Sequence, residues 1–275
     1  MEYDRIIITG ASSGLGEVFA RELAKTAAGE ACEMILIARR QERLERLAQE
    51  LQERHSGVRA RALGADLAEP AERERLLREL TALPARRSLL VNNAGLGDYG
   101  EFATSEASKN NRLMQVNMLA AVELTHGLLP QMLEAGGDII NTASLAADVA
   151  LPDFALYAAS KAFLAAYSEG LRLELRGRGV RTLAVCPGPV HTEFGSVAQR
   201  AGHDRGDMPL KQWFYTPAET VVRAALRALK AGRARCYPSM KIWLSASLLH
   251  TLPLWAHRLL LGTRPRRVKQ LKTNA

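Results

Sequence analysis

The sequence has few cysteines and few aromatic residues. Cys32, Cys186 and Cys236 are the three cysteines among 275 residues, and they lie far apart without a CxxC motif or a His/Cys cluster. This spacing argues against a disulfide framework and against a metal site, and it fits a reducing compartment. Aromatic residues make up 5% of the chain, so the net charge of +8 lacks the stacking platforms typical of nucleic-acid binding.

The sequence also lacks the pattern of a secretory signal. Residues 1–5 run directly into the apolar residues 6–8, without a basic region, a longer apolar region and a cleavage site. We therefore expect a cytoplasmic protein. Hydrophobic residues still make up 47% of the chain, which suits one large α/β domain with a substantial core.

Short apolar runs alternate with longer segments of helical period. This pattern is typical of a parallel sheet covered by helices on both faces. The predicted strands are residues 5–9, 34–38, 58–64, 89–92, 138–142 and 181–186. The predicted helices are residues 14–28, 42–55, 70–81, 108–135 and 154–177. We therefore predict an α/β fold, a single-domain doubly wound (Rossmann) parallel sheet of about seven strands with a C-terminal helical extension, whose ligands bind at the carboxyl ends of the strands.

Two segments depart from the alternation, and they set the predicted domain organisation. We expect a catalytic domain over residues 1–240 and an apolar helix with a basic tail over residues 241–275. Residues 188–215 have weak periodicity and follow the last predicted strand, so we interpret them as a substrate lid rather than an inert loop.

The C-terminal segment contains a helix-spaced apolar stripe. Its residues are Leu244, Leu248, Leu252, Trp255 and Leu259. Proline and charged residues interrupt the stripe, so a lipid-exposed span across a membrane is not predicted. With the basic tail, residues 242–272 have the composition of a peripheral membrane contact. The favoured alternative is that the stripe covers the substrate cleft or packs on another subunit.

A glycine-rich loop joins the first predicted strand to the first predicted helix. Gly10, Gly14 and Gly16 follow Thr9 with the spacing Gly-x3-Gly-x-Gly, which differs from the GxGxxG fingerprint. Glycines let a pyrophosphate approach the backbone, and the amides at the start of the following helix favour an anion. We predict that the loop binds a dinucleotide, with Ser12, Ser13 and Leu15 as further contacts.

The end of the second predicted strand distinguishes between the nicotinamide cofactors. An acidic residue there typically accepts from the ribose of NAD, whereas arginine accommodates the 2′-phosphate of NADP. Here Arg39 and Arg40 stand at this position without a carboxylate, which predicts NADP(H) over NAD(H). Arg39 is the first choice and Arg40 the second, although either could simply begin a solvated helix. Asp66 and Leu67, after the third strand, are predicted to contact the adenine.

Tyr157 and Lys161 lie four residues apart on a predicted helix and therefore share a face. A nearby ammonium is expected to lower the pKa of the phenol from its ordinary value of about 10. Such a group can transfer a proton to or from a carbonyl oxygen near neutral pH. Ser144 ends the fifth predicted strand, and its hydroxyl could hydrogen-bond the same oxygen.

The spacing of a tyrosine and a lysine is a weak signal by itself. Tyr237 and Lys241 repeat it, but Pro238 between them disfavours a continuous helix. Ala224 stands thirteen residues before Tyr237, where Ser144 stands thirteen residues before Tyr157. The ordered combination therefore carries the prediction.

That combination resembles the short-chain dehydrogenase/reductase family across about residues 4–192. The matching motifs are Thr9-Gly10-x3-Gly14-x-Gly16, Asn92-Asn93-Ala94-Gly95, Asn117, Ser144, Tyr157-x3-Lys161 and Pro187-Gly188. The resemblance implies that Tyr157 is the catalytic acid/base, that Ser144 polarises the substrate and that Lys161 lowers the tyrosine pKa and holds the nicotinamide ribose. It implies that Asn117 supports a water-mediated proton relay to Lys161.

The resemblance also implies further cofactor contacts. Residues 92–95 would stabilise the sheet and pass close to the cofactor, and the nicotinamide end would meet Pro187, Gly188, Val190 and Thr192. Many NADP-preferring members carry a basic residue where this chain has Ser13, so the phosphate would rest mainly on Arg39, with the Ser12 or Ser13 hydroxyl. A homodimer or homotetramer through the helices at 108–135 and 154–177 is implied as well.

The sequence thus predicts an oxidoreductase that moves a hydride between NADP(H) and a carbonyl/secondary alcohol pair. Reduction of an apolar ketone or aldehyde by NADPH is the expected direction. One alternative is an NAD(P)-dependent alcohol dehydrogenase working oxidatively. The other is a catalytically silent NADP-binding sensor, which usually has a broken catalytic set, whereas all four positions are filled here.

Overall fold

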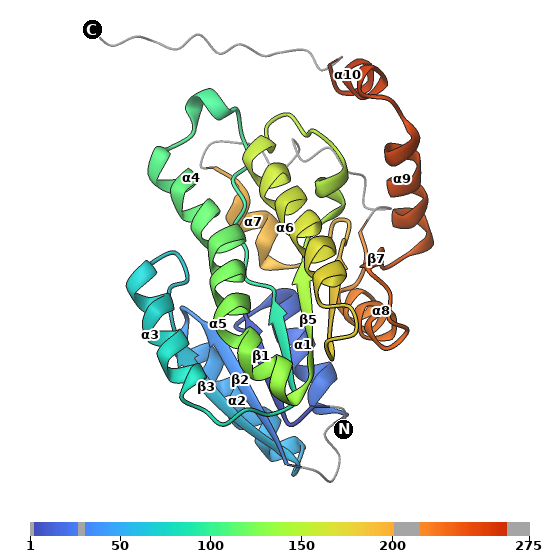
Figure 1. The fold of residues 1–275 in the computed structure, drawn as a ribbon. Helices are drawn as coiled ribbons and strands as arrows, with labels where there is room; N and C mark the ends of the chain where they lie inside the picture. The colour runs from blue at the N-terminus through green and yellow to red at the C-terminus, as the bar shows by residue number, and fades with distance from the viewer. Residues whose placement is uncertain (1–2, 27–30, 201–214, 263–275) are drawn as a thin grey trace, which may run out of the picture.

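In the residues that the structure, a computed structural model, describes (3–26, 31–200 and 215–262), seven parallel strands form one sheet in the order β3-β2-β1-β4-β5-β6-β7 (Figure 1). The strands are β1 Arg5–Thr9, β2 Cys32–Ala38, β3 Val58–Gly64, β4 Ser88–Asn92, β5 Gly137–Thr142, β6 Val180–Val185 and β7 Arg235–Cys236. The predicted doubly wound α/β fold is confirmed. The seventh strand is two residues long, too short for a period to indicate it.

Helices cover both faces of the sheet. The α-helices of the described residues are α1 Gly14–Ala24, α2 Gln41–Arg54, α3 Pro70–Thr81, α4 Ala107–Met114, α5 Ala120–Ala135, α6 Ala155–Glu174, α7 Glu193–Ala198, α8 Ala218–Lys230, α9 Met240–Thr251 and α10 Leu254–Gly262. On one face, Phe19 of α1, Leu44 of α2 and Val221 of α8 are buried in the same core cluster. On the other, Leu76 of α3 and Leu124 of α5 pack in a second cluster. Burial from both sides is why strands such as β1, β2 and β4 read as apolar runs, whereas β3, at the edge of the sheet, contains Arg59 and Arg61.

The helix predicted over residues 108–135 is not one regular helix. Between α4 and α5 lies a π-helical turn, η2 Gln115–Leu119, which contains Asn117. A π-turn has no separate hydrophobic period, so the sequence pattern reads through it, and such turns are frequent at functional sites. The first predicted helix is also shorter than expected, ending at Ala24, and residues 27–30 lie outside the described ranges.

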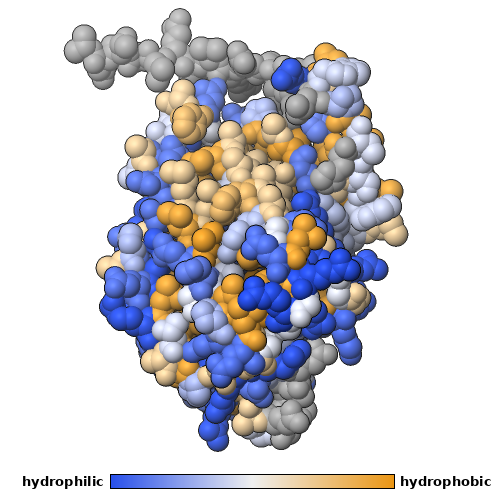
Figure 2. Space-filling model, viewed as in Figure 1, coloured by the Kyte–Doolittle hydropathy of each residue, from blue (hydrophilic) through white to orange (hydrophobic). Residues whose placement is uncertain are grey.

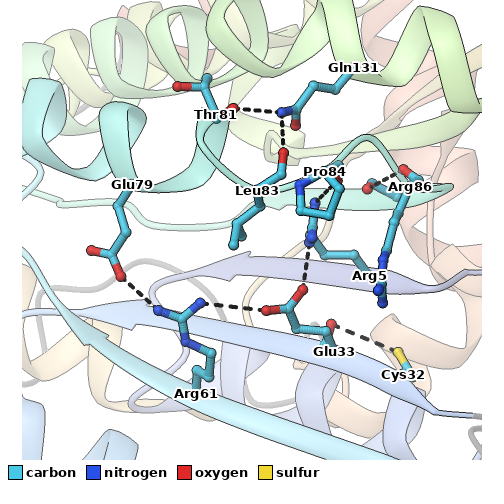
Figure 3. A network of polar contacts seen from close by, with 11 residues as sticks. Arg5, Cys32, Glu33, Arg61, Glu79, Thr81, Leu83, Pro84, Arg86 and Gln131 are labelled. Carbon is cyan, nitrogen blue, oxygen red and sulfur yellow. Dashed lines mark hydrogen bonds and ion pairs between the residues drawn. The ribbon is translucent and has the colours of Figure 1, made fainter.

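A network of charged side chains lies toward the amino ends of the first strands (Figure 3). Arg5 Nε donates to Glu33 Oε2 at 2.8 Å, and Arg5 Nη1 donates to the Pro84 carbonyl at 3.0 Å. Arg61 bonds Glu79 at 2.8 Å and also pairs with Glu33. Ligands of open parallel sheets bind beyond the opposite, carboxyl ends of the strands. This network therefore stabilises the sheet and does not form part of the site.

Candidate active site

The loop after β1 forms a cradle of bare backbone. Gly10 and Gly14 have φ values of +67° and +58°, which favour glycine. A Cβ at Gly16 would lie 2.2 Å from the Gly10 carbonyl oxygen, and a Cβ at Gly10 would lie 2.9 Å from the Cα of Ala94. The loop packs so closely on itself and on the loop after β4 that a side chain at either position would push these segments apart.

Thr9 locks this loop to the loop that follows β4. Its hydroxyl oxygen accepts from the backbone amides of Asn93 and Ala94 at 2.9 and 3.0 Å. The side-chain amide of Asn93 in turn donates to the Thr9 carbonyl at 3.0 Å. Sequence reasoning gave Thr9 no role beyond opening the motif. Its buried hydroxyl explains why a hydroxylated residue precedes the first glycine.

The start of α1 fits an anion. Its N-cap residue, Ser13, makes no side-chain capping hydrogen bond to the first helical amides. Those amides and the positive end of the helix dipole favour a phosphate group. The cradle and the uncapped helix end together fit the pyrophosphate of a dinucleotide, and Leu15 packs behind them against the core.

Arg40, rather than Arg39, lies against this loop. Arg40 Nη2 donates to the Ser13 hydroxyl at 2.6 Å, and its Nε donates to the Ser12 hydroxyl at 3.3 Å. Both arginines are exposed, but the charge of Arg39 acts on Asp66 instead. The two side chains contact different segments at the start of α2. Two adjacent arginines in a sequence do not reveal which one will contact the glycine-rich loop.

A third arginine joins this group. Arg43 Nη1 and Arg40 Nη1 each donate to a carboxylate oxygen of Glu193 at 2.8 Å. Hydrogen bonds from Arg43 and then Arg40 lower the pKa of Glu193 to about 2. Sequence reasoning missed both Arg43 and Glu193. The spacing of Arg40 and Arg43, one helical turn apart, was an available signal for the first, whereas Glu193 begins helix α7, 150 residues beyond Arg43.

Asp66 and Leu67 lie just beyond β3, where the adenine was predicted. One carboxylate oxygen of Asp66 accepts from the Ala68 amide at 3.0 Å, and the other accepts from Arg112 at 2.6 Å. Burial opposes ionisation of Asp66, but these hydrogen bonds outweigh it and the pKa is lowered. Asp66 is therefore a fixed anion held by the chain itself, and Leu67 is buried in the core.

The predicted catalytic side chains lie together at the carboxyl ends of β5 and β6. Ser144 caps the short helix η3 Leu145–Asp148, and its hydroxyl accepts from the Ala146 amide at 3.1 Å. Tyr157 and Lys161 lie one turn apart on α6, and the Tyr157 hydroxyl hydrogen-bonds Ser144. Lys161 Nζ donates to the Thr142 carbonyl at 2.8 Å and lies 5.7 Å from the centroid of the Tyr157 ring.

The pKa of Tyr157 differs from the expectation. Burial raises it to about 12, and the hydrogen bond with Ser144 opposes this only in part. Burial likewise lowers the pKa of Lys161 to about 8. The prediction that Lys161 lowers the tyrosine pKa is thus wrong for the residues of the chain alone, because desolvation dominates both groups. A further charge or hydroxyl at the site is needed to reverse the shift.

Replacing Lys161 by methionine is expected to stabilise the cofactor-free protein at neutral pH while it abolishes activity. The buried ammonium has its pKa lowered from 10.5 to about 8. Between these values the unfolded chain keeps a proton that the folded protein has released, so the contribution of Lys161 to stability rises with pH through this window. At about 1.4 kcal/mol per pKa unit, the methionine variant gains at most about 3 kcal/mol at pH 7.

Urea unfolding of both proteins at neutral pH and at about pH 10 measures this effect. Both proteins retain Tyr157 and the cysteines, so their difference isolates Lys161. The advantage of the variant should shrink at the higher pH, and an advantage of equal size at both pH values would contradict the assignment.

Asn117 is held by its own side chain. Its amide nitrogen donates to the Leu96 carbonyl and to the Ser160 hydroxyl, both at 2.9 Å, and its oxygen accepts from the Leu96 amide at 2.7 Å. Gly95 lies between Asn117 and Lys161, because a Cβ there would be 3.3 Å from Lys161 Nζ and 3.6 Å from Asn117 Oδ1. The structure therefore places Asn117 beside the catalytic lysine as a clamp on the loop after β4. Its part in a proton relay stays a prediction.

An apolar wall surrounds the Tyr157 ring. Phe154 stacks on it with the ring centroids 4.3 Å apart, and Phe194 approaches it to 5.4 Å. Tyr99 meets Phe154 edge-on at 5.7 Å. Partly buried residues packed around the same cluster are Leu96, Leu151 and Leu156. Sequence reasoning missed this wall, whose residues come from four separate loops and helices.

The segment after β6 contacts the residue after Ser144 and the glycine-rich loop. The Pro187 carbonyl accepts from the Leu145 amide at 2.8 Å, and Val190 pairs with Thr216 beyond Gly188. Thr192 caps α7 and lies against Gly14, where a Cβ would be 3.2 Å from the threonine methyl group. Residues 201–214 of the predicted lid lie outside the described ranges. The lid itself stays a prediction.

Both ends of α7 are held by ion pairs. Glu193 at its start bonds Arg40 and Arg43. Just beyond its end, Arg200 Nη2 bonds Asp98 at 2.6 Å, and both side chains are largely buried. A Cβ at Gly97 would lie 2.8 Å from both Phe194 and Ala198, so α7 packs directly on the loop after β4.

The repeated Tyr-x3-Lys pair is not arranged as the first pair is. The Tyr237 hydroxyl donates to Asp148 at 3.0 Å, and Lys241 Nζ donates to the Tyr215 carbonyl at 3.2 Å. Tyr237 follows β7 and Lys241 lies on α9, so no single helix carries both. The tertiary setting distinguishes the two pairs, as their different surroundings in the sequence predicted.

Comparison with known proteins identifies the family. Residues 4–201 match the family model described as short chain dehydrogenase. The chain belongs to the short-chain dehydrogenase family. It is 36% identical over 205 residues to sulfoacetaldehyde reductase 2 of Chromohalobacter salexigens. The matched region covers 74% of this chain and 78% of that protein.

Solved structures of this family match nearly the whole chain. A short-chain dehydrogenase from Sphingobium yanoikuyae in complex with NADPH is 30% identical, with a TM-score of 0.78 and 98% of each chain covered. A bulky-bulky ketone specific alcohol dehydrogenase from Comamonas testosteroni is 26% identical, with a TM-score of 0.72 and 98% of each chain covered. The predicted enzyme class is confirmed: this short-chain dehydrogenase is an NAD(P)-dependent oxidoreductase acting on CH–OH groups.

Proposed function

We propose that this short-chain dehydrogenase reduces an apolar ketone or aldehyde with NADPH, and that Tyr157 gives the proton. The observation that carries the proposal is the position of the Tyr157 hydroxyl, which is hydrogen-bonded to Ser144 and walled by the rings of Phe154 and Phe194. A carbonyl oxygen that meets both hydroxyls places its carbon substituents against aromatic rings. The likeness to an alcohol dehydrogenase specific for bulky ketones supports an apolar substrate.

Each catalytic side chain has one proposed role. Bound NADPH supplies the hydride. Tyr157 holds the proton at its hydroxyl oxygen and gives it to the carbonyl oxygen, which Ser144 orients by a second hydrogen bond. Lys161 would hold the nicotinamide ribose of the bound cofactor. Hydrogen bonds from the ribose hydroxyls would oppose the effect of burial, which raises the pKa of Tyr157. Asn117 keeps the neighbouring loop and Ser160 in place.

The proposed cofactor contacts follow the carboxyl edge of the sheet. They are Gly10, Ser12, Ser13, Gly14, Leu15, Gly16, Arg39, Arg40, Asp66, Leu67, Asn93, Ala94, Gly95, Tyr157, Lys161, Pro187, Gly188, Val190 and Thr192, with Arg43 added from the structure. For the 2′-phosphate of NADP we now favour Arg40 and Arg43 over Arg39. Their shared partner is a carboxylate, Glu193, and a phosphate group offers the same guanidinium groups a stronger acceptor.

Replacing Arg40 by alanine is expected to lower kcat/KM with NADPH by about 10- to 100-fold and to leave kcat/KM with NADH nearly unchanged, because only NADPH carries the phosphate. Arg39→Ala is the matched control and should change the preference much less. The assay follows the oxidation of NADPH and of NADH in the presence of aliphatic, aromatic, steroid-like and 3-oxoacyl carbonyl compounds. The reverse reaction is followed with the product alcohols and NADP.

This assay tests the cofactor preference and the apolar substrate separately. A parent enzyme that prefers NADH, or an Arg40→Ala variant with unchanged preference, would contradict the NADP assignment. Turnover confined to small charged carbonyls would contradict the apolar substrate, whichever cofactor is used.

We further propose that copies of the chain associate through the face formed by α4, η2, α5 and α6. Figure 2 shows apolar side chains gathered over these helices. Met114, Leu119 and Phe163 expose between 36% and 41% of their surface there. A homodimer or homotetramer would cover this face.

A further inference from the structure

The last two helices carry large apolar side chains on their outer surface. On α9 they are Met240, Trp243, Leu244 and Leu248, and on α10 they are Trp255 and Leu259. We call these six residues the α9–α10 surface. Each exposes between 49% and 70% of its surface. Figure 1 shows both helices at the edge of the molecule, beyond the carboxyl end of the sheet.

The other side of α9 explains why this surface faces outward. Ile242 and Ala246 are fully buried, and α9 packs through them on η3, directly after Ser144. The ring of His257 on α10 lies 3.0 Å from the Leu249 carbonyl and holds the corner between the helices. Of the apolar stripe predicted from the sequence, Leu244, Leu248, Trp255 and Leu259 lie on the exposed side, whereas Leu252 is half-buried. The exposed side chains of the stripe do not pack on the active site, and packing on another subunit, the other form of the favoured alternative, stays a prediction.

In the sequence, the segment that carries this surface has charge of one sign. No aspartate or glutamate occurs after Glu219 in the sequence. From residue 240 to the end, the basic residues are Lys241, Arg258, Arg264, Arg266, Arg267, Lys269 and Lys272. The segment that carries the apolar surface therefore belongs to a stretch of the sequence with basic charge only, which attracts anions.

We propose that the α9–α10 surface, which lies in a segment with basic charge only, binds a bilayer that contains anionic phospholipid. Leucine side chains enter the acyl boundary, tryptophans lie at the level of the headgroups, and cations meet lipid phosphates. Within the described ranges, no helix is long and apolar enough to cross a membrane, so the contact lies in the interface plane. A second copy is a poorer occupant, because a symmetric contact would bring the two cationic segments together.

This binding is independent of the proposed substrate. It has a structural consequence for the enzyme, since α9 packs on the segment after Ser144. The carboxyl edge of the sheet, with its catalytic residues, then lies on the side of the molecule that faces lipid.

Vesicle co-sedimentation tests the proposal on the full chain. We expect the parent to bind vesicles made of equal parts phosphatidylcholine and phosphatidylglycerol about tenfold or more tightly than vesicles of phosphatidylcholine alone, and added salt should weaken the binding. The triple variant Leu244→Ser, Leu248→Ser, Trp255→Ser should lose about tenfold or more of the binding to the mixed vesicles. Leu173→Ser is the matched control, since Leu173 is 67% exposed on α6.

A second measurement needs no substitution on the two helices. In the Trp213→Phe protein, the remaining tryptophans are Trp243 and Trp255, and brominated lipid in the mixed vesicles should quench their fluorescence. Absence of quenching, equal binding by the parent and the triple variant, or equal binding to neutral and anionic vesicles would overturn the proposal. Light scattering identifies the competing occupant: a triple variant with fewer subunits and unchanged vesicle binding would make this surface an interface between copies.

Discussion

Replacing Tyr157 by phenylalanine is expected to lower kcat by about 10²- to 10⁴-fold, the usual contribution of a positioned acid or base. The dissociation constant for NADPH should stay close to that of the parent. The substitution removes the hydroxyl that bonds Ser144 but keeps the ring that stacks on Phe154 and meets Phe194. The site therefore keeps its shape and loses its proton donor. Single-turnover kinetics and fluorescence titration with NADPH measure the two quantities separately.

Tyr237→Phe provides the matched control. Tyr237 stands four residues before a lysine as Tyr157 does, but its hydroxyl donates to Asp148 instead of facing the site. We expect kcat to be unchanged in this variant. Equal losses in both variants would indicate that folding, not proton transfer, is affected. A parent that binds NADPH but turns over none of the carbonyls would instead favour the sensor alternative, and Tyr157→Phe would then change nothing.

Replacing Gly16 by alanine is expected to abolish cofactor binding and to destabilise the folded protein by about 2–3 kcal/mol, the range for overpacked sites. The added Cβ would lie 2.2 Å from the Gly10 carbonyl oxygen and 2.6 Å from Asn93 Nδ2. Neither atom can move freely. Gly10 is held at φ +67° against Ala94, and Asn93 is bonded to Thr9. Urea unfolding and NADPH titration measure the two effects.

Gly170→Ala is the control for this substitution. Gly170 lies inside α6 as Gly16 lies inside α1, but a Cβ at Gly170 would meet no atom within 4 Å. This variant should be more stable than the parent by about 0.5–1 kcal/mol, because alanine loses less conformational freedom in a helix than glycine. A Gly16→Ala protein that binds NADPH as the parent does would show that the close approach is not required.

Much of the site was predictable because its parts are local in the sequence. Strands buried on both faces must be apolar runs, so their carboxyl ends, and the residues just after them, can be located without a structure. Ser144 follows such a run, and Tyr157 and Lys161 share a face of one helix because they are four residues apart. Local periodicity carries this information, and the structure leaves these residues where the sequence predicted them.

Other features depend on contacts between distant segments. Arg40 turns toward Ser13 while Arg39 does not, and Glu193 reaches Arg40 and Arg43 from the start of α7. The aromatic wall is likewise assembled from Phe154, Phe194 and Tyr99 only when the chain has folded. A side chain's direction out of a loop is set by its partners there, and no period in the sequence records it.

The sequence by itself determined the class of protein, the order of its strands along the chain, and the residues that meet at the catalytic edge. The tertiary structure alone decided how the environment acts on them. Burial raises the pKa of Tyr157, although an adjacent lysine argued for the opposite, because desolvation depends on everything packed around the pair. It also decided that the stripe of α9 and α10 faces outward, because α9 packs on η3 and buries Ile242 and Ala246 on its other side.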